Sequence, residues 1–361
     1  MRFYLTDTAN TRVFKVGVNG ARMKLVGGDS GHVESEELVE DVVLAPSERV
    51  VVDMLFDRPG SVTLEHRTPE RTYSLAEITV TEEPAEPGLA EEFETLRVNE
   101  DLSAERERTA SYVEAEPDKT LAFVAEMDMG EPETEVGTAV YACPMHAEIV
   151  ATWEGKCPIC GMKLVVEPTA RPTAFACPMH PEITATCPGT CPKCGMTLRP
   201  TEAGRGEMAE HEGHEHHGAE HAHDPAGGIE WEDDMVEMNR KTTSANMRWL
   251  IVDRETGAEN AAIDWRFRVG DQVKIRLVNE MESDHPMHHP FHIHGAGRFL
   301  VLSRDGVVEP NLVLKDTVLV RTGETVDILL DVSNPGLWMA HCHIAEHHES
   351  GMMFSFDVAP A

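Results

Sequence analysis

Two histidine-rich segments far apart in the chain, residues 289–295 and 341–352, constrain the fold more than any other feature. The second segment places a cysteine between two histidines and follows it with another histidine and a methionine. One thiolate, two imidazoles and a weakly bound thioether are the ligands of a blue-copper centre, and the first segment can supply the second imidazole. The chain must therefore fold so that both segments meet around one ion. The expected ligands are His289, Cys342, His347 and Met352.

Four further histidines in these segments form two His-x-His pairs, which are His292 with His294 and His341 with His343. Alternate residues of a strand point to the same face, so each pair projects two imidazoles together. A lone His-x-His pair is more often structural than a metal site. Two separated motifs, each with the spacing that a copper–thiolate site demands, favour the metal interpretation.

This double pattern resembles the C-terminal domain of the multicopper oxidases, laccase-like enzymes with a cupredoxin fold. The resemblance implies that His289, Cys342, His347 and Met352 bind type 1 copper, where a substrate is oxidised. It further implies that His292 binds a type 2 ion and that His294, His341 and His343 bind a type 3 pair, so that dioxygen is reduced to water at a trinuclear cluster. Cys342 is then the electron bridge.

The family takes four more cluster histidines from an N-terminal cupredoxin domain, which we do not find in this sequence. The other His-x-His patterns, His214 with His216 and His221 with His223, lie in a Gly/Glu/His-rich run and are poor substitutes for buried ligands. The chain also opens directly on a strand at residues 2–5, without a signal peptide, which we interpret as an N-terminal truncation with Met1 as an internal start. We expect a missing domain or a second subunit to complete the cluster, and an exported, periplasmic or extracellular, full-length protein.

Residues 1–83 alternate short strands with Gly, Pro and Asp turns, the pattern of a β-sandwich. They resemble the copper-free middle cupredoxin domain of the same family. This block contains His32 and His66 but no cysteine, so a type 1 site is excluded there, and both histidines are expected at the surface. Residues 84–117 form an acidic linker with a helix predicted over residues 89–107.

The second cupredoxin-like domain is predicted to comprise residues 118–130 and 229–361, interrupted by an insertion that contains an internal repeat. The repeats occupy residues 139–168 and 173–201, and each contains Cys-x-x-His followed by Cys-x-x-Cys. Three thiolates and an imidazole form the tetrahedral set expected for zinc or another soft ion. The predicted ligands are Cys143, His146, Cys157 and Cys160 in the first repeat, and Cys177, His180, Cys191 and Cys194 in the second.

The Cys-Pro-Met-His and Cys-Pro-x-Cys-Gly-Met pieces of these repeats resemble the small heavy-metal-binding domains attached to copper pumps and other metal-handling proteins. We expect zinc or Cu(I) in both. A disulfide framework is the alternative, but with Cys342 assigned to copper the insertion has an odd number of thiols, Cys187 being the unpaired one. Residues 202–228 form a His-rich linker that can bind metal by composition, or an inert acidic tether.

Together these features predict a mainly β protein: two cupredoxin-like Greek-key β-sandwiches, with two small metal-binding modules inserted in the second. The formal charge of −33 argues against a nucleic-acid partner, and no membrane span is visible. The function expected is a copper-dependent oxidase that couples oxidation of a small reductant or Cu(I) to dioxygen reduction, with a role in copper tolerance. The alternative is a non-enzymatic copper-binding, heavy-metal-binding or electron-transfer protein with an incomplete trinuclear site.

Overall fold

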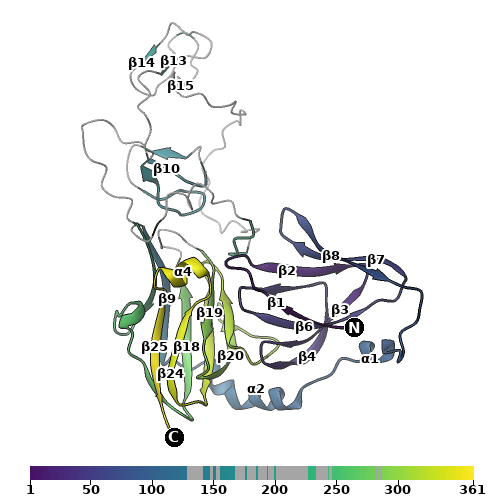
Figure 1. Ribbon diagram of the computed structural model, residues 1–361. Coiled ribbons are helices and arrows are strands. Elements are labelled where there is room, and N and C mark those ends of the chain that lie inside the picture. Colours follow the sequence, from purple (N-terminus) through teal and green to yellow (C-terminus); the bar gives the residue numbers. More distant parts are fainter. Residues whose placement is uncertain are drawn as a thin grey trace.

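A computed structural model of the chain describes residues 1–127, 141–146, 149–151, 155–166, 175–176, 184–185, 193, 199–200, 227–232, 243, 246–280, 283 and 287–361. It consists mostly of strands, arranged in two β-sandwiches that lie side by side, with an inserted segment beyond one end of the second (Figure 1). Among the described residues, no helix is both long and apolar enough to span a membrane.

The N-terminal sandwich is built from two four-stranded sheets, whose strand orders are β1-β6-β3-β4 and β5-β2-β7-β8. Side chains alternate between the two faces of each strand, and the inward set closes a core that includes Val16, Met23, Val52 and Met54. This confirms the predicted β-sandwich. The strands are β1 Arg2–Thr6, β2 Phe14–Asn19, β3 Arg22–Gly28, β4 Gly31–Val39, β5 Asp41–Leu44, β6 Arg49–Leu55, β7 Gly60–Arg67 and β8 Thr72–Val80.

The two histidines of this sandwich differ in burial. His32 is exposed, as expected, but the prediction for His66 is wrong, because its side chain is buried. The His66 Nδ1 atom accepts a hydrogen bond from the Lys15 N–H, and its ring packs against those of Phe14 and Tyr73. Burial lowers the pKa of His66, so the ring acts as a neutral core residue.

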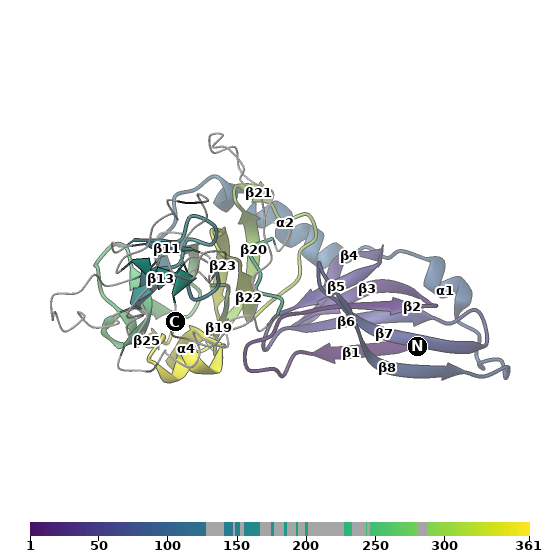
Figure 2. The same cartoon turned by 90° about the horizontal axis from the view of Figure 1, so that it is seen from above.

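The linker forms two helices, α1 Ala90–Glu94 and α2 Glu100–Val113, where one helix over residues 89–107 is predicted. The single helix is interrupted because Val98 forms a β-bridge with Ser35 of the N-terminal sandwich. The Asn99 side chain then accepts a hydrogen bond from the Asp101 N–H and caps the second helix. Helix α2 runs alongside both sandwiches (Figure 2).

The C-terminal sandwich packs a six-stranded sheet, ordered β16-β9-β18-β23-β20-β21, against a five-stranded sheet, ordered β17-β25-β24-β19-β22. Its core is the largest hydrophobic cluster among the described residues and includes Phe123, Ile275, Phe291, Ile328 and Phe354. The strands are β9 Lys119–Met127, β16 Met247–Asp253, β17 Arg266–Arg268, β18 Gln272–Asn279, β19 His289–Ile293, β20 Gly297–Arg304, β21 Val307–Val308, β22 Thr317–Val320, β23 Thr325–Val332, β24 Gly336–Cys342 and β25 Met353–Ala359, with η1 Asn260–Ala262 and the short helix α4 Ala345–Glu349. The mainly β fold class is confirmed.

The insertion connects two strands that are direct neighbours in the six-stranded sheet. Strands β9 and β16 are antiparallel, and their register ends with Met127 opposite Met247. The chain therefore leaves and re-enters the sheet at adjacent points. Before re-entry, Ile229 and Trp231 pack with Val13 and Ala45 of the N-terminal sandwich, rather than forming a strand.

Each repeat of the insertion forms a three-stranded sheet of the same order. In the first, β10 Tyr141–Ala142 lies between β11 Val150–Ala151 and β12 Val165–Val166. In the second, β13 Phe175–Ala176 lies between β14 Thr184–Ala185 and β15 Arg199–Pro200. Corresponding strands start 34 residues apart (175 minus 141, 184 minus 150 and 199 minus 165), so the sequence repeat is also a structural one. The first repeat shares its buried core with the C-terminal sandwich through Met162, Leu164 and Val165.

Candidate metal centres

One cysteine and two histidines from three separate elements meet inside the C-terminal sandwich. His289 opens β19, Cys342 closes β24, and His347 lies on α4. The Cys342 Sγ atom is 3.6 Å from the His289 Nδ1 and 3.4 Å from the His347 Nδ1, and the two Nδ1 atoms are 3.2 Å apart. We call these three residues the thiolate cluster.

The dimensions of the thiolate cluster suit one three-coordinate ion. Metal–sulfur and metal–nitrogen bonds of ~2.3 and ~2.0 Å at trigonal angles would separate the ligand atoms by about 3.5–3.8 Å. All three side chains are buried, and burial raises the pKa of the Cys342 thiol to about 12. A bound cation is therefore needed to hold the thiolate at neutral pH.

Met352 lies next to the thiolate cluster. Its carbonyl accepts a hydrogen bond from the Cys342 N–H at 3.2 Å, and its N–H donates to the His347 carbonyl at 3.0 Å. Its side chain is part of the same buried core. This placement brings together all four residues that the sequence analysis assigns to the first site.

Two aromatic residues that sequence reasoning missed enclose the thiolate cluster. Trp249 stacks on His347 with 3.6 Å between ring centroids, and Phe123 stacks on His289 at 5.0 Å. Both come from strands β16 and β9 of the opposite sheet. Apolar aromatic residues in strands are ordinary core residues, so no local pattern distinguishes these two. They exclude water from the ligand atoms and fix the planes of both imidazoles.

A second group of histidines lies on the other side of β24. His292 is paired in register with His341, and the His294 Nε2 atom is 2.9 Å from the His341 Nε2. The ligand atoms of His292, His294 and His341 lie within 4.8 Å of one another. We call these three residues the imidazole cluster. The ring of His343 borders it, 5.4 Å from that of His341 and 5.8 Å from that of His292.

The surroundings of His294, His341 and His343 keep these three rings neutral. Burial, reinforced by the neighbouring histidines, lowers the pKa of His341 to about 3, and the pKa values of His294 and His343 are lowered for the same reasons. The His341 Nδ1–H donates to the Cys342 carbonyl at 2.8 Å, which leaves its Nε2 lone pair directed at the cluster. Neutral imidazoles with free lone pairs are the form that binds metal.

A carboxylate and a hydroxyl hold the remaining nitrogen of His292. The His292 Nδ1 atom is 2.8 Å from the Thr317 Oγ1 and 3.6 Å from the Asp316 Oδ1. Burial alone would raise the pKa of Asp316, but the nearby His292 ring and the hydrogen bonds from Arg49 outweigh it and hold that pKa far below its usual range. The sequence analysis missed both residues, since their distance from the histidine motifs gives no signal.

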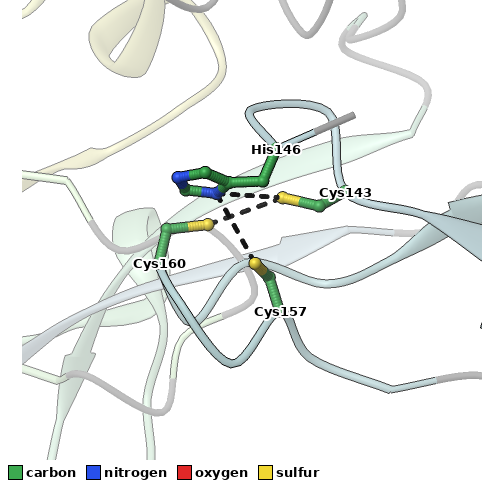
Figure 3. A group of neighbouring side chains, drawn as sticks. All are labelled: Cys143, His146, Cys157 and Cys160. Carbon is green, nitrogen blue, oxygen red and sulfur yellow. Dashed lines mark hydrogen bonds between the residues drawn. The ribbon is translucent and has the colours of Figure 1, made fainter. Parts of the chain in front are cut away.

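The first repeat brings its four predicted ligands together, as Figure 3 shows. The Cys143 Sγ atom is 3.7 Å from the His146 Nδ1 and 3.5 Å from the Cys160 Sγ, and the Cys157 Sγ is 3.6 Å from the same Nδ1. A tetrahedral ion with zinc-like bond lengths separates its ligands by about 3.6–3.8 Å. We call this group the module site. Gly161, with φ of 75°, makes the tight turn behind Cys157 and Cys160.

The disulfide alternative does not fit the first repeat. Cys143, Cys157 and Cys160 are free, and the 3.5 Å between the sulfurs of Cys143 and Cys160 far exceeds the ~2.05 Å of a disulfide bond. The predicted ligands of the second repeat (Cys177, His180, Cys191 and Cys194) lie outside the described residues, as do Cys187 and the His-rich run of residues 211–223.

Comparison with protein families finds matches in three segments of the chain. Residues 232–361 match the family model described as multicopper oxidase. Residues 140–167 and 174–201 each match the model described as heavy metal binding domain. The multicopper oxidase match contains the thiolate cluster and the imidazole cluster, and the first heavy metal binding domain match contains the module site.

Curated relatives and solved structures agree with these matches. The oxidoreductase tpcJ of Aspergillus fumigatus is 33% identical over 119 residues, which cover 31% of this chain and 19% of the relative. The multicopper oxidase mco of Staphylococcus epidermidis is 38% identical over 93 residues, which cover 25% of this chain and 21% of the relative. The matches thus span about a fifth of each relative's length.

The solved structure of a multicopper oxidase from Campylobacter jejuni, described as a metallo-oxidase, superposes on 99% of this chain with a TM-score of 0.51 and 19% identity. This chain corresponds to 53% of that structure. The likeness extends over both sandwiches and supports the cupredoxin-like fold.

Proposed function

The chain belongs to the multicopper oxidases and carries two heavy-metal-binding domains, and on this basis we propose that it forms part of a copper-dependent oxidase with dioxygen as electron acceptor. In this proposal the thiolate cluster, together with Met352, would hold type 1 copper. The imidazole cluster and His343 contribute to the type 2 and type 3 sites. The observation that carries the proposal is the arrangement of residues around the end of β24.

Strand β24 and the residue after it connect the two clusters by a few covalent bonds. His341, Cys342 and His343 are consecutive, so the cysteine side chain and the two imidazoles project to opposite faces of the strand. The His341 Nδ1–H donates to the Cys342 carbonyl and shortens the connection further. A binding protein for a single ion has no need of this juxtaposition, whereas an oxidase that reduces dioxygen needs two coupled sites.

Copper, when bound, supplies one-electron redox chemistry that joins single-electron oxidation of a reductant to the four-electron reduction of dioxygen. The protein residues set the conditions for it. Trp249 and Phe123 keep water from the thiolate cluster, and the Met352 thioether would help to hold the copper and set its potential. Asp316 stabilises the Nδ1–H form of His292, so that the Nε2 lone pair is available as a ligand.

The other ligands of a trinuclear cluster would come from a further cupredoxin domain, of the same protein or of a partner subunit. In support of this, the Campylobacter jejuni structure is about twice as long as this chain, which covers 53% of it. We also propose that the whole protein is exported.

For the reductant, we propose a metal ion such as Cu(I), rather than a phenol. The first repeat shares a buried core with the C-terminal sandwich, so its soft-ligand module site is fixed to the domain that holds the thiolate cluster. Thiolates bind Cu(I) in preference to harder ions of the same size. Zinc in the module site, with a purely structural role, is the competing assignment.

Electron paramagnetic resonance with visible absorption tests the copper sites. The copper-loaded chain is examined after a mild chelator has stripped the module site. Type 1 and type 2 signals together with oxygen uptake support the oxidase. A type 1 signal alone, without oxygen uptake even when a complementary cupredoxin domain is added, supports the alternative of an electron-transfer or metal-binding protein.

A comparison of two reductants tests the substrate. Oxygen uptake with Cu(I) and with a phenolic dye is measured for the complete chain and for a variant lacking residues 131–228. We expect Cu(I) turnover that falls on deletion. Dye oxidation that is insensitive to the deletion, with no Cu(I) turnover, would overturn the assignment.

A further inference from the structure

A compact group of charges lies between the two sandwiches and reaches the imidazole cluster. Arg49, at the start of β6, donates two hydrogen bonds to the Asp316 carboxylate, at 2.6 and 2.7 Å. It also donates to the carbonyls of Ser47 and Asp29, at 2.8 and 3.1 Å. The two NH₂ groups of Arg49 thus use all four of their N–H donors, out of five on the guanidinium. These bonds fix the guanidinium in one orientation.

Asp29 and Lys315 complete this group of charges. The Asp29 carboxylate, which is fully buried, accepts hydrogen bonds from the backbone N–H of Arg49 at 2.8 Å and from the backbone N–H of Thr317 at 3.3 Å. Lys315 pairs with Asp29 at 3.3 Å and with Glu48 at 3.2 Å. Residues on both sides of the domain boundary are therefore held in one network, and Asp316 and Thr317 belong to it.

The hydrogen-bond directions within this network determine the tautomer of His292. The Thr317 hydroxyl donates to the Asp316 Oδ1 at 3.0 Å, because an ionised carboxylate can only accept. With its proton directed to Asp316, the hydroxyl must accept from the His292 Nδ1, 2.8 Å away. The His292 Nδ1 then carries the hydrogen, and the Nε2 keeps its lone pair for a metal ion.

We propose that Arg49 of the copper-free N-terminal sandwich is a positioning residue for the metal ligand His292, acting through Asp316 and Thr317. The inference rests on the proposed function in so far as His292 is taken as a copper ligand. It adds a role for the N-terminal sandwich beyond that of a spacer: this domain supplies the guanidinium whose two hydrogen bonds fix the orientation of the Asp316 carboxylate.

If the Arg49 guanidinium is removed, the neighbouring described cations Arg298 and Lys315 cannot take its place beside Asp316. Arg298 is 3.8 Å from the Asp316 carboxylate and donates to the Ser30 Oγ instead, and Lys315 is engaged by Asp29 and Glu48. Asp316 would lose its bidentate partner while staying largely buried. A carboxylate that rotates away from this position no longer accepts from Thr317, and the hydroxyl becomes free to donate to His292.

Nuclear magnetic resonance of the metal-free full chain, labelled with ¹⁵N at histidine, tests the proposal. Long-range ¹H–¹⁵N correlations distinguish Nδ1–H from Nε2–H rings, and the His292 signals are assigned by their loss in His292→Gln. We expect the Nδ1–H form in the wild type and a shift towards Nε2–H in Arg49→Met and in Thr317→Val. Arg49→Lys, which keeps the charge but not the fork, should lie between them.

Zinc alone, at buffered free concentrations, provides the second measurement, read at the His292 signals so that other sites do not interfere. Loss of a residue that orients a metal-bound histidine typically weakens metal affinity about 10- to 100-fold, and we expect this range for Arg49→Met and Thr317→Val. If wild-type His292 shows no zinc binding, the proposed metal site fails, while the tautomer result still decides the positioning role.

Arg106→Met is the matched control. Arg106 also joins the two sandwiches, pairing with Glu34 of the first and donating to the carbonyls of Glu309 and Pro310 of the second, but it does not contact the His292 network. It should leave the tautomer and the zinc affinity unchanged. An equal shift in Arg106→Met would reduce the effect to general loosening of the interface. An unchanged tautomer in Arg49→Met would also overturn the proposal, and Thr317→Val decides if Arg49→Met does not fold.

Discussion

Replacing Gly295 with alanine should destabilise the C-terminal sandwich beside the imidazole cluster. Gly295 follows His294 and has φ of 49°, a left-handed conformation that disfavours side chains. A Cβ atom there would lie 2.1 Å from the Trp338 Cζ3 and 2.6 Å from two further atoms of the same ring. The indole must therefore move, although its Nε1–H donates to the Asn334 carbonyl at 2.9 Å.

Two contributions give the expected magnitude. The left-handed conformation costs an alanine about 1 kcal/mol relative to glycine. Displacing the indole breaks one hydrogen bond, about 1 kcal/mol, and disturbs its packing by about another 1 kcal/mol. The sum of about 3 kcal/mol corresponds to a fall of roughly 6–12 °C in the unfolding temperature of a domain of this size.

Gly306→Ala separates these contributions. Gly306 also has a positive φ, of 77°, but a Cβ atom there would meet no atom within 4 Å. Scanning calorimetry should show a fall of only about 2–4 °C for this variant, from about 1 kcal/mol. Equal falls for the two variants would refute the steric argument. We also expect Gly295→Ala, but not Gly306→Ala, to weaken zinc binding read at His294.

Three further outcomes follow from the structure. Cys160→Ser should remove one bound metal equivalent, measured by plasma mass spectrometry after dialysis, whereas Ile159→Ser, an exposed change in the same loop, should not. Burial raises the pKa of Asp7 to about 7, so the stability linked to its protonation is present below about pH 4 and is lost as the pH rises through 7. In urea unfolding at pH 8, Asp7→Asn should therefore be more stable than the wild type by about 1–2 kcal/mol. This advantage should shrink at pH 5. Lys274→Met should cost about 2–4 kcal/mol, because the buried ammonium donates to the carbonyls of Val113 and Ala115 and pairs with Asp327. Loss of the exposed pair in Arg266→Met should leave the free energy of unfolding unchanged in the same assay.

The ligand groups could be predicted from the sequence because metal chemistry concentrates them in short segments. His341, Cys342 and His343 are adjacent, and alternation along a strand assigns them to two faces without knowledge of the fold. The module site is equally local, since its cysteines and histidine recur at fixed spacing. The sandwich architecture followed from turn residues and strand alternation, which are also local signals.

The residues that surround these ligands could not be predicted in this way. Asp316, Trp249 and Arg49 reach the clusters only through strand pairing and domain packing, and each is an ordinary residue in its own segment. His66 was predicted at the surface because nothing nearby in sequence reveals the aromatic residues that cover it. The break between α1 and α2 likewise depends on a bridge from Val98 to a distant strand.

The pairing of Met127 with Met247 determines how much loop-closure entropy the insertion costs. Residues 128 to 246 (246 minus 127, or 119 residues) join two points of the sheet that are only about 5 Å apart, as opposed residues of antiparallel strands are. Closing a flexible loop of that length instead of a four-residue one costs only about 3 kcal/mol, since the entropy grows with the logarithm of length. Folding of the modules shortens the effective loop and reduces this cost further. Loop-closure entropy thus opposes the gain, loss or exchange of repeats at this hairpin only weakly, whereas the first repeat is also held to the sandwich by their shared buried core.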